Sequence, residues 1–376
     1  MKLLIFTILL MGAAIIMLLQ TESSAVSGLD QNKPKKTEAP SQQTNENVQH
    51  RAQPIRLSVA DMASNAWEFL FRGQNRTPDI PLPHTPVALS YFMNLAGGQL
   101  NVTWLGHSSL MINIGGYRIL VDPVFEKRIS LIGPTRFNGS VPLDIDDVPQ
   151  VDAVVISHDH YDHLNKFSVE QLRPKTSKFI VPLGVGDLIK KWGVPRQKII
   201  ELDWWQEFHF DTQLMFAATP AQHFSGRGLM DRNERLWSSW VIKTPCHRLF
   251  FSGDSGYFEG FKQIGETYGP FDMTFIECGA YNKAWAQVHL FPEKTVQAHL
   301  DLKGKVLHPI HWGTFNLAMH SWYEPMERLL AEAKARQIGI AIPMVGETTR
   351  YGELLPVAMW WREAIEQKTE TKKENS

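Results

Sequence analysis

The run Ser157-His158-Asp159-His160-Tyr161-Asp162-His163-Leu164 concentrates the chemistry of this chain, with three imidazoles and two carboxylates within six residues. Imidazole nitrogens and carboxylate oxygens are the ligands that zinc binds in proteins. A solvated polar turn is the alternative, but imidazoles crowded on one loop repel one another when protonated unless a metal or a carboxylate holds them. The pattern therefore indicates a metal site.

The spacing within this cluster suggests two places for metal ions. The apolar run 153–156 predicts a buried strand directly before it. His158 and His160 are two residues apart, so in an extended chain both rings lie on one face and suit one metal. Asp162 and His163 fall where the chain turns toward a helix that Asp or Asn would cap. They point elsewhere and suit a second metal.

Three further polar residues follow predicted strands, namely His223, Asp254 and His311. A lone His or Asp at such a place is usually structural. Together with the cluster, however, they bring the set to five histidines and two aspartates from four strand ends. That set fills two sites of three protein ligands each, with one bridging carboxylate. Asp122, before Pro123 at another strand end, fits equally a capping group and a carboxylate that orients a metal-bound imidazole.

The elements that must position these residues alternate between strands and helices. The sequence 110–121 predicts a hairpin, because Gly115-Gly116 can take positive φ between two apolar runs. Strands before helices in both halves predict an α/β layered fold with sheets inside and helices outside. Further strands are predicted over 101–105, 153–156, 179–182, 199–202, 214–217, 239–242, 249–252, 305–308 and 338–342, and helices over 185–192, 292–300 and 324–335.

The N-terminal region predicts contact with a membrane. Lys2 precedes Leu3–Leu19, seventeen residues without a charge, and the lysine places the rest of the chain across the membrane. The alternative is a signal peptide cleaved near Ala25-Val26-Ser27, which would give a secreted protein. We divide the chain into an anchor or signal segment (1–20), a flexible linker (21–55), an N-terminal arm with a short helix over 57–72 (56–99), a catalytic domain (100–364) and a disordered tail (365–376).

The composition limits the kinds of partner that the chain is expected to bind. With 43% hydrophobic and 20% charged residues and a formal charge of −1, the chain has a globular composition and no basic stripe of the kind that binds nucleic acid. Cys246 and Cys278 are the only cysteines, too few for a disulfide framework. They either pair in an oxidising compartment or are small buried residues.

Several runs resemble the metallo-β-lactamase superfamily, and more narrowly its branch of N-acyl-phosphatidylethanolamine-hydrolysing phospholipase D and bacterial relatives. The resemblance covers about 101–351 and implies the four-layer αββα sandwich. The departures from the family's pattern are the leader and the residues after His223 and around Trp285. The runs that carry the resemblance are TWLGHSS (103–109), HDHYDH (158–163), PAQH (220–223), FSGDSGY (251–257), HWGTF (311–315) and ELDWW (201–205).

The resemblance also implies roles for individual residues. One zinc would be held by His158, His160 and His223, the other by Asp162, His163 and His311, with Asp254 bridging them. Asp122 matches an aspartate that supports a metal-bound imidazole, and His289 matches a histidine near the substrate phosphate. Two roles remain equal for His107, His299 and His308: each could support a metal ligand or pack in the core.

These observations predict a membrane-associated enzyme with two Zn²⁺ that cleaves a phosphodiester, most specifically N-acyl-phosphatidylethanolamine to N-acylethanolamine and phosphatidic acid. Asp254 is placed to accept a proton, and His289 to steady the phosphate or protonate the leaving oxygen. The expected partners are a membrane phospholipid, the membrane itself and a second copy in a homodimer. The residues expected to line the acyl groove are Phe224, Tyr281, Trp285 and Leu290.

Two other functions remain open at this point. A lactonase or a small phosphoester hydrolase of the same superfamily would use the same ligands on a different substrate. The other is a metal-stabilised binding protein without activity. Loss of metal ligands would indicate such a protein, but all seven are present.

Overall fold

The computed structural model describes residues 75–93, 98–131, 133–228 and 230–366. The predicted membrane segment, the linker and the helix expected over 57–72 lie outside the described residues, as does the tail from 367 onward. Within the described ranges, no helix has the length and hydropathy needed to cross a bilayer.

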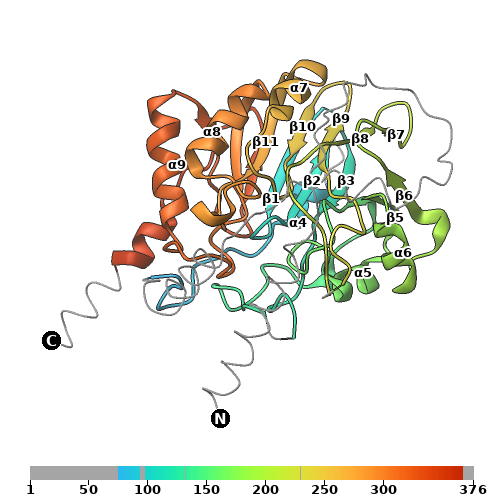
Figure 1. The fold of residues 1–376 in the computed structure, drawn as a ribbon, viewed down its shortest axis with the longest axis horizontal. Coiled ribbons are helices and arrows are strands. Elements are labelled where there is room, and N and C mark those ends of the chain that lie inside the picture. The colour runs from blue at the N-terminus through green and yellow to red at the C-terminus, as the bar shows by residue number, and fades with distance from the viewer. Residues whose placement is uncertain (1–74, 94–97, 132, 229, 367–376) are drawn as a thin grey trace, which may run out of the picture.

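Two seven-stranded sheets form the centre of the molecule (Figure 1). In each sheet, four neighbouring strands are antiparallel and the strands beyond them are parallel. The first sheet has the order β14 (Thr348–Arg350), β1 (Leu100–Trp104), β2 (Leu110–Ile114), β3 (Tyr117–Val121), β4 (Val151–Val155), β5 (Thr176–Pro182), β6 (Ile199–Leu202). The second has the order β13 (Gly339–Ile340), β12 (Gly304–Ile310), β11 (Phe271–Glu277), β10 (Arg248–Phe251), β9 (Ser239–Lys243), β8 (Met215–Thr219), β7 (Glu207–His209).

The predicted hairpin is confirmed. Strands β2 and β3 pair from Leu110 opposite Val121 to Ile114 opposite Tyr117. Gly115 and Gly116 between them have φ of 59° and 95°, the region that a tight hairpin turn requires and that glycine adopts without strain.

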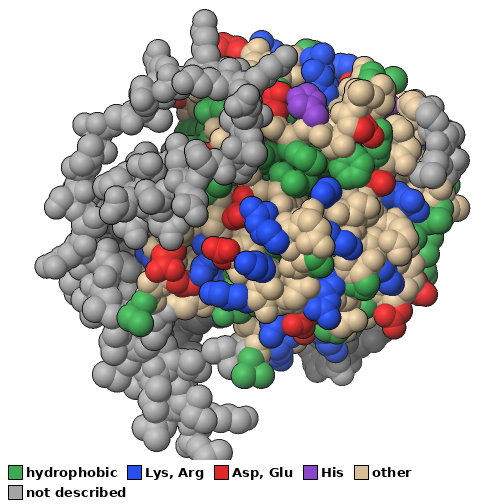
Figure 2. All heavy atoms as spheres, turned by 90° about the vertical axis from the view of Figure 1, so that its right-hand side faces the viewer, with side chains coloured by type: hydrophobic (Ala, Val, Ile, Leu, Met, Phe, Trp, Pro, Cys, Tyr) green, Lys and Arg blue, Asp and Glu red, His purple; other side chains and the backbone are tan. Residues whose placement is uncertain are grey.

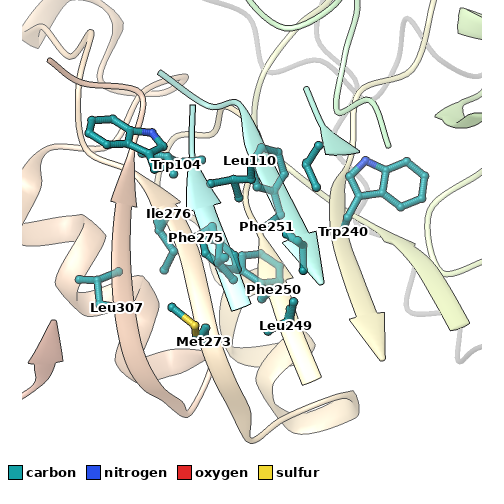
Figure 3. Packing of buried hydrophobic residues seen from close by; sticks show 14 of the residues in the cluster. Trp104, Leu110, Trp240, Leu249, Phe250, Phe251, Met273, Phe275, Ile276 and Leu307 are labelled. Carbon is teal, nitrogen blue, oxygen red and sulfur yellow. The ribbon is translucent and has the colours of Figure 1, made fainter. Parts of the chain in front are cut away.

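Side chains of the first sheet alternate between two hydrophobic layers. Leu110, Ile112 and Ile114 of β2 face the second sheet, whereas Met111 belongs to the layer beneath the helices. Figure 3 shows Leu110 of the first sheet beside Phe251 of the second, in one cluster with Trp104, Phe250 and other buried side chains. Because both faces are covered, these strands read as continuous apolar runs in the sequence.

Helices cover the outer face of each sheet, which confirms the αββα sandwich (Figure 1). On the first sheet lie α5 (Lys166–Leu172) and α6 (Val185–Lys191), and on the second α7 (Gly260–Thr267), α8 (Pro292–Asp301) and α9 (Glu324–Ala335). The face shown in Figure 2 carries Lys and Arg side chains with Asp and Glu among them. The shorter helical segments are α4 (Leu89–Met93), η1 (Ile145–Asp147), η2 (Arg196–Lys198) and η3 (Lys283–Trp285).

Some boundaries differ from the predicted ones. Helix α7 was not predicted, and α5 was predicted only as a capped helix after His163, without bounds. Helix α7 contains Gly265, where an added Cβ would lie 2.2 Å from the carbonyl oxygen of Asp301. The glycine therefore allows α7 to pack closely against the end of α8. The strand expected over 338–342 is only the two residues of β13. Residues 360–366 are helical, and Ile365 packs on the core, so placing the tail from 365 was wrong.

The segment before β1 also packs on the sandwich where it is described. Leu82 and Phe92 are buried in the two main hydrophobic clusters. The two cysteines are unpaired, with Cys246 exposed and Cys278 buried.

Candidate metal centre

Strands of both sheets deliver polar side chains to one edge of the sandwich. Strand β4 leads to His158, and the turn after it carries His160, Asp162 and His163 before α5 begins. Asn165 caps α5, because its side chain accepts the backbone N–H of Ser168, as the predicted helix start requires. The remaining contributors follow other strands: Asp122 after β3, His223 after β8, Asp254 after β10, Glu277 at the end of β11 and His311 after β12.

Four of these residues form a first pocket, defined as His158, His160, His223 and Asp254, whose ligand atoms all lie within 4.8 Å of one another. His160 Nδ1 is 2.8 Å from His158 Nε2 and 3.2 Å from His223 Nε2. Asp254 Oδ2 is 3.8 Å from His158 Nε2 and 3.7 Å from His223 Nε2. Ligands of one tetrahedral zinc are separated by roughly 3.3 Å, since each bond is about 2.0–2.1 Å. The pocket therefore has the dimensions of a metal site.

A second pocket, defined as His107, Asp162, His163 and His311, adjoins the first. Asp162 Oδ2 lies 2.9 Å from His107 Nε2, 3.4 Å from His311 Nε2 and 3.5 Å from His163 Nε2. Asp254 also reaches this pocket, since its Oδ1 is 3.2 Å from His163 Nε2 and its Oδ2 is 3.1 Å from His311 Nε2. One carboxylate thus contacts both pockets, the place that the resemblance implies for a bridging ligand.

Several buried atoms in this centre lack a hydrogen bond among the described residues, namely His163 Nε2, both ring nitrogens of His311 and Asp254 Oδ1. Buried polar atoms are normally satisfied, and bound metal ions would engage these lone pairs. The donor set and its orphaned atoms therefore fit metal binding.

Asp122 orients an imidazole in each pocket. Its Oδ2 accepts from His163 Nδ1 at 2.7 Å and from the Ser157 hydroxyl, and its Oδ1 accepts the Ser157 N–H at 2.7 Å. The Ser157 oxygen lies 2.9 Å from His158 Nδ1. With protons on both Nδ1 atoms, the Nε2 atoms of His158 and His163 are free to bind metal. Of the two roles left open for Asp122, the structure favours the orienting one.

The two pockets differ in electrostatics. Burial and the nearby charge of His163 hold the pKa of His158 well below 6.5, and burial does the same for His223. Burial also opposes charge on His163, but the carboxylates of Asp254 and Asp162 outweigh it and raise the pKa well above 6.5. The same carboxylates, acting against burial, raise the pKa of His311 to about 10.

His289 lies beside both pockets. Its ring centre is 5.1 Å from that of His223 and 5.4 Å from that of His311. Its Nδ1 is 2.8 Å from Glu277 Oε2. Sequence reasoning missed Glu277. The one signal was a charged residue closing the apolar run of β11, which is buried along its whole length.

Of the residues expected to line an acyl groove, the structure leaves two partly exposed. Phe224 packs on His160 and His223, and Trp285 donates its Nε1–H to the carbonyl of Ala280. For Leu290 and Tyr281 the prediction was wrong, because they are only 1% and 3% exposed. Leu290 belongs to the main core, and Tyr281 stacks on His320 with its hydroxyl on Glu324.

Comparison with known proteins identifies a matching family, relatives in sequence and a solved structure of similar fold. A family model described as a beta-lactamase superfamily domain matches residues 117–312. An uncharacterised protein of Mycobacterium tuberculosis is 44% identical over 303 residues, 79% of this chain and 80% of that protein. The N-acyl-phosphatidylethanolamine-hydrolyzing phospholipase D 1 of Caenorhabditis elegans is 34% identical over 275 residues, 69% of this chain and 76% of the nematode protein. The structure of isothiocyanate hydrolase from Delia radicum gut bacteria is similar in fold, with a TM-score of 0.55 and 19% identity over 66% of this chain and 98% of its own.

Proposed function

Because the chain belongs to the metallo-β-lactamase superfamily, we propose that this hydrolase is a membrane-associated phosphodiesterase that uses two zinc ions. Its substrate is N-acyl-phosphatidylethanolamine, and the products are N-acylethanolamine and phosphatidic acid. The name of the nematode relative, which shares 34% of its aligned residues with this chain, supports the substrate, and the apolar segment at 3–19 supports the membrane.

The observation that carries the proposal is the position of Asp254. Its two oxygens lie 3.1–3.8 Å from ring nitrogens of His158, His163, His223 and His311. A carboxylate shared between two adjacent pockets is the arrangement of two-metal hydrolytic sites, which clamp the attacking and leaving oxygens of an in-line displacement.

In this proposal the first ion would be held by His158, His160 and His223, the second by Asp162, His163 and His311, and Asp254 would be shared between them. Bound zinc would supply Lewis acidity toward a water molecule and toward the phosphoryl oxygens. Asp254 is placed to take a proton from the attacking water, and His289, at the open side of the centre, is placed to hold the phosphate and protonate the leaving oxygen.

The test is a substrate panel offered to purified, zinc-loaded protein: N-acylated phosphatidylethanolamine, plain phosphatidylethanolamine, an acyl lactone and a β-lactam, with products identified by mass. We expect N-acylethanolamine and phosphatidic acid from the first lipid, at a higher kcat/KM than for the others. Robust lactone hydrolysis without phosphodiester cleavage would replace the lipid assignment with a lactonase on the same ligands.

The acyl part of the substrate is tested separately with Trp285→Ala. Trp285 is partly exposed four residues before His289, so its loss should raise KM for a long-chain lipid more than for a short soluble phosphodiester. Equal effects on the two substrates would contradict an apolar wall at this residue.

Membrane association is tested by fractionation of the full-length chain and of a chain that begins at Gln53. We expect the full-length protein with membranes and the shortened one in the soluble fraction. If both are equally soluble and the mature N-terminus lies near Gly28, the leader is a cleaved signal.

A further inference from the structure

Glu277 is a buried carboxylate that the ligand set above does not use. It ends β11 with 0% exposure, and burial raises the pKa of its carboxyl group. A carboxylate in such a place is costly unless donors surround it. Its contacts therefore indicate what it does.

Three donors surround Glu277, and they come from the two loops that frame the centre. Its Oε1 accepts the backbone N–H groups of Ser255 at 2.8 Å and Leu290 at 3.1 Å. These residues directly follow Asp254 and His289 in the chain. Its Oε2 lies 2.8 Å from His289 Nδ1. One side chain thus fixes the loop of Asp254, the loop of His289 and the His289 ring.

The contact with Glu277 determines how His289 faces the centre. A carboxylate can only accept, so Nδ1 carries the proton, and Nε2 is the nitrogen left for a substrate. The His289 side chain is 14% exposed, whereas that of Glu277 is fully buried. Glu277 therefore engages the Nδ1 side of the ring, and the ring centre lies 5.1 Å from that of His223 and 5.4 Å from that of His311.

We propose that Glu277 is a positioning residue that makes His289 the proton donor to the leaving oxygen. This inference rests on the proposed phosphodiester hydrolysis. As the water oxygen bonds to phosphorus and the P–O bond to the leaving group breaks, a proton passes from Nε2 of His289 to the leaving oxygen. The Nδ1 proton stays on its bond to Glu277, and the ring regains a proton from solvent. Glu277 fixes the ring and stabilises its positive charge.

The same atoms offer one competing role. Ligand atoms of Asp254, Glu277, His289 and His311 all lie within 4.8 Å of one another, the spacing of a further metal site. The hydrogen bond of 2.8 Å between Glu277 Oε2 and His289 Nδ1 satisfies both groups without an ion. The geometry therefore favours a proton between Glu277 and His289 over a metal ion at this place.

The experiment compares two phosphodiesters with leaving groups of different basicity. An alkoxide needs a proton to leave, whereas p-nitrophenolate does not. Glu277→Gln keeps the size of the side chain and removes its charge. It should lower kcat for an alkyl phosphodiester about 10²-fold and leave kcat for bis(p-nitrophenyl) phosphate within about threefold, with zinc content unchanged. A similar loss on both substrates, or a loss of zinc, overturns the proposal.

Two further variants separate this role from a merely structural one. Asp272→Asn is the matched control: Asp272 lies at the far end of the same strand and also has three donors, from Arg248, Lys305 and Tyr351. It should lower the melting temperature without any preference for one leaving group. His289→Asn keeps a donor to Glu277 and should show the full leaving-group effect. If the double variant is no slower on the alkyl substrate than His289→Asn alone, Glu277 acts through His289; additive losses contradict this.

A measurement on the metal-free protein is independent of activity. NMR of the histidine rings should find a proton on Nδ1 of His289, with a downfield Nδ1–H signal that moves upfield in Glu277→Gln. A His289 ring without a proton on Nδ1 in the unsubstituted protein overturns the proposal even if the variant fails to fold. If NMR gives the expected form and no phosphodiester is cleaved, the proposed function fails while the contact stands.

Discussion

The first and second pockets use the same kinds of side chain, but the pKa values of their imidazoles are shifted differently. In the first, burial and neighbouring imidazoles hold the pKa values of His158, His160 and His223 below 6.5, so the rings are neutral lone-pair donors. In the second, carboxylates raise the pKa values of His163 and His311 above 6.5 and favour protons on these two rings, whereas burial lowers the pKa of His107 to about 3.

This contrast follows from where the carboxylates lie. Asp162 contacts three imidazoles of the second pocket at 2.9–3.5 Å, and Asp122 lies 2.7 Å from His163. In the first pocket Asp254 is the one carboxylate, at 3.7–3.8 Å from the ring nitrogens of His158 and His223. A metal enters the first pocket without competition from protons, whereas in the second it must displace them.

The largest effect is expected at the residue that the two pockets share. Asp254→Asn removes a negative charge and one ligand oxygen from both. We expect kcat to fall by about 10³-fold or more, far beyond any loss of stability. Activity, metal content and melting temperature are measured on one preparation. A loss confined to one ion would show that Asp254 serves a single pocket.

Single-pocket variants should each remove one ion. We expect about two zinc ions per chain in the unsubstituted protein, because seven ligands exceed what one tetrahedral ion uses. Both His160→Ala and Asp162→Ala should lower the content to about one, as measured by elemental analysis. If Asp162→Ala retains all its zinc, or if the metal-replete protein holds only one ion, the second pocket is not a metal site.

The grouping of these side chains, apart from His107, could be predicted from sequence because its signals are local. The cluster at 158–163 falls within one turn, and His223, Asp254 and His311 each follow a recognisable apolar strand. The sandwich could be predicted for the same reason. Both faces of its strands are buried, so the strands appear as apolar runs in the sequence.

The supporting residues other than Asp122 could not be predicted, because their partners are distant in the sequence. His107 contacts Asp162 across 55 residues, whereas His299 bonds to Thr274 and His308 is buried between Trp104 and Phe275. Nothing in their sequence neighbourhoods separates these three histidines. The role of Glu277 depends on a loop that returns to the end of β11, and Leu290 is turned inward by that same loop.

A pH series sharpens the contrast between the pockets. A raised pKa means that His163 and His311 hold protons at neutral pH in the metal-free protein, so metal affinity there falls as pH falls. The first-pocket imidazoles, with lowered pKa values, stay neutral until pH is below 6.5. Dialysis at decreasing pH should release zinc in two steps separated by about one pH unit or more, the second pocket first. A single step, or release of the first-pocket ion first, would contradict the assigned charge states.

The smallest effect is expected at Ser157, whose hydroxyl links Asp122 to His158. Asp122 contacts His163 directly but reaches His158 through the Ser157 hydroxyl. Because that hydroxyl also lies 3.4 Å from His163 Nδ1, Ser157→Ala should weaken the first-pocket ion about tenfold and the second-pocket ion less, at a cost of about 1 kcal/mol in the free energy of unfolding. Chelator competition on the two ions measures this. Ser239→Ala is the matched control, because that buried hydroxyl bonds to Thr219 and Pro220 and not to an imidazole. If both variants weaken the first ion equally, the effect is one of packing; if only Ser157→Ala does, one carboxylate orients histidines in both pockets by two routes.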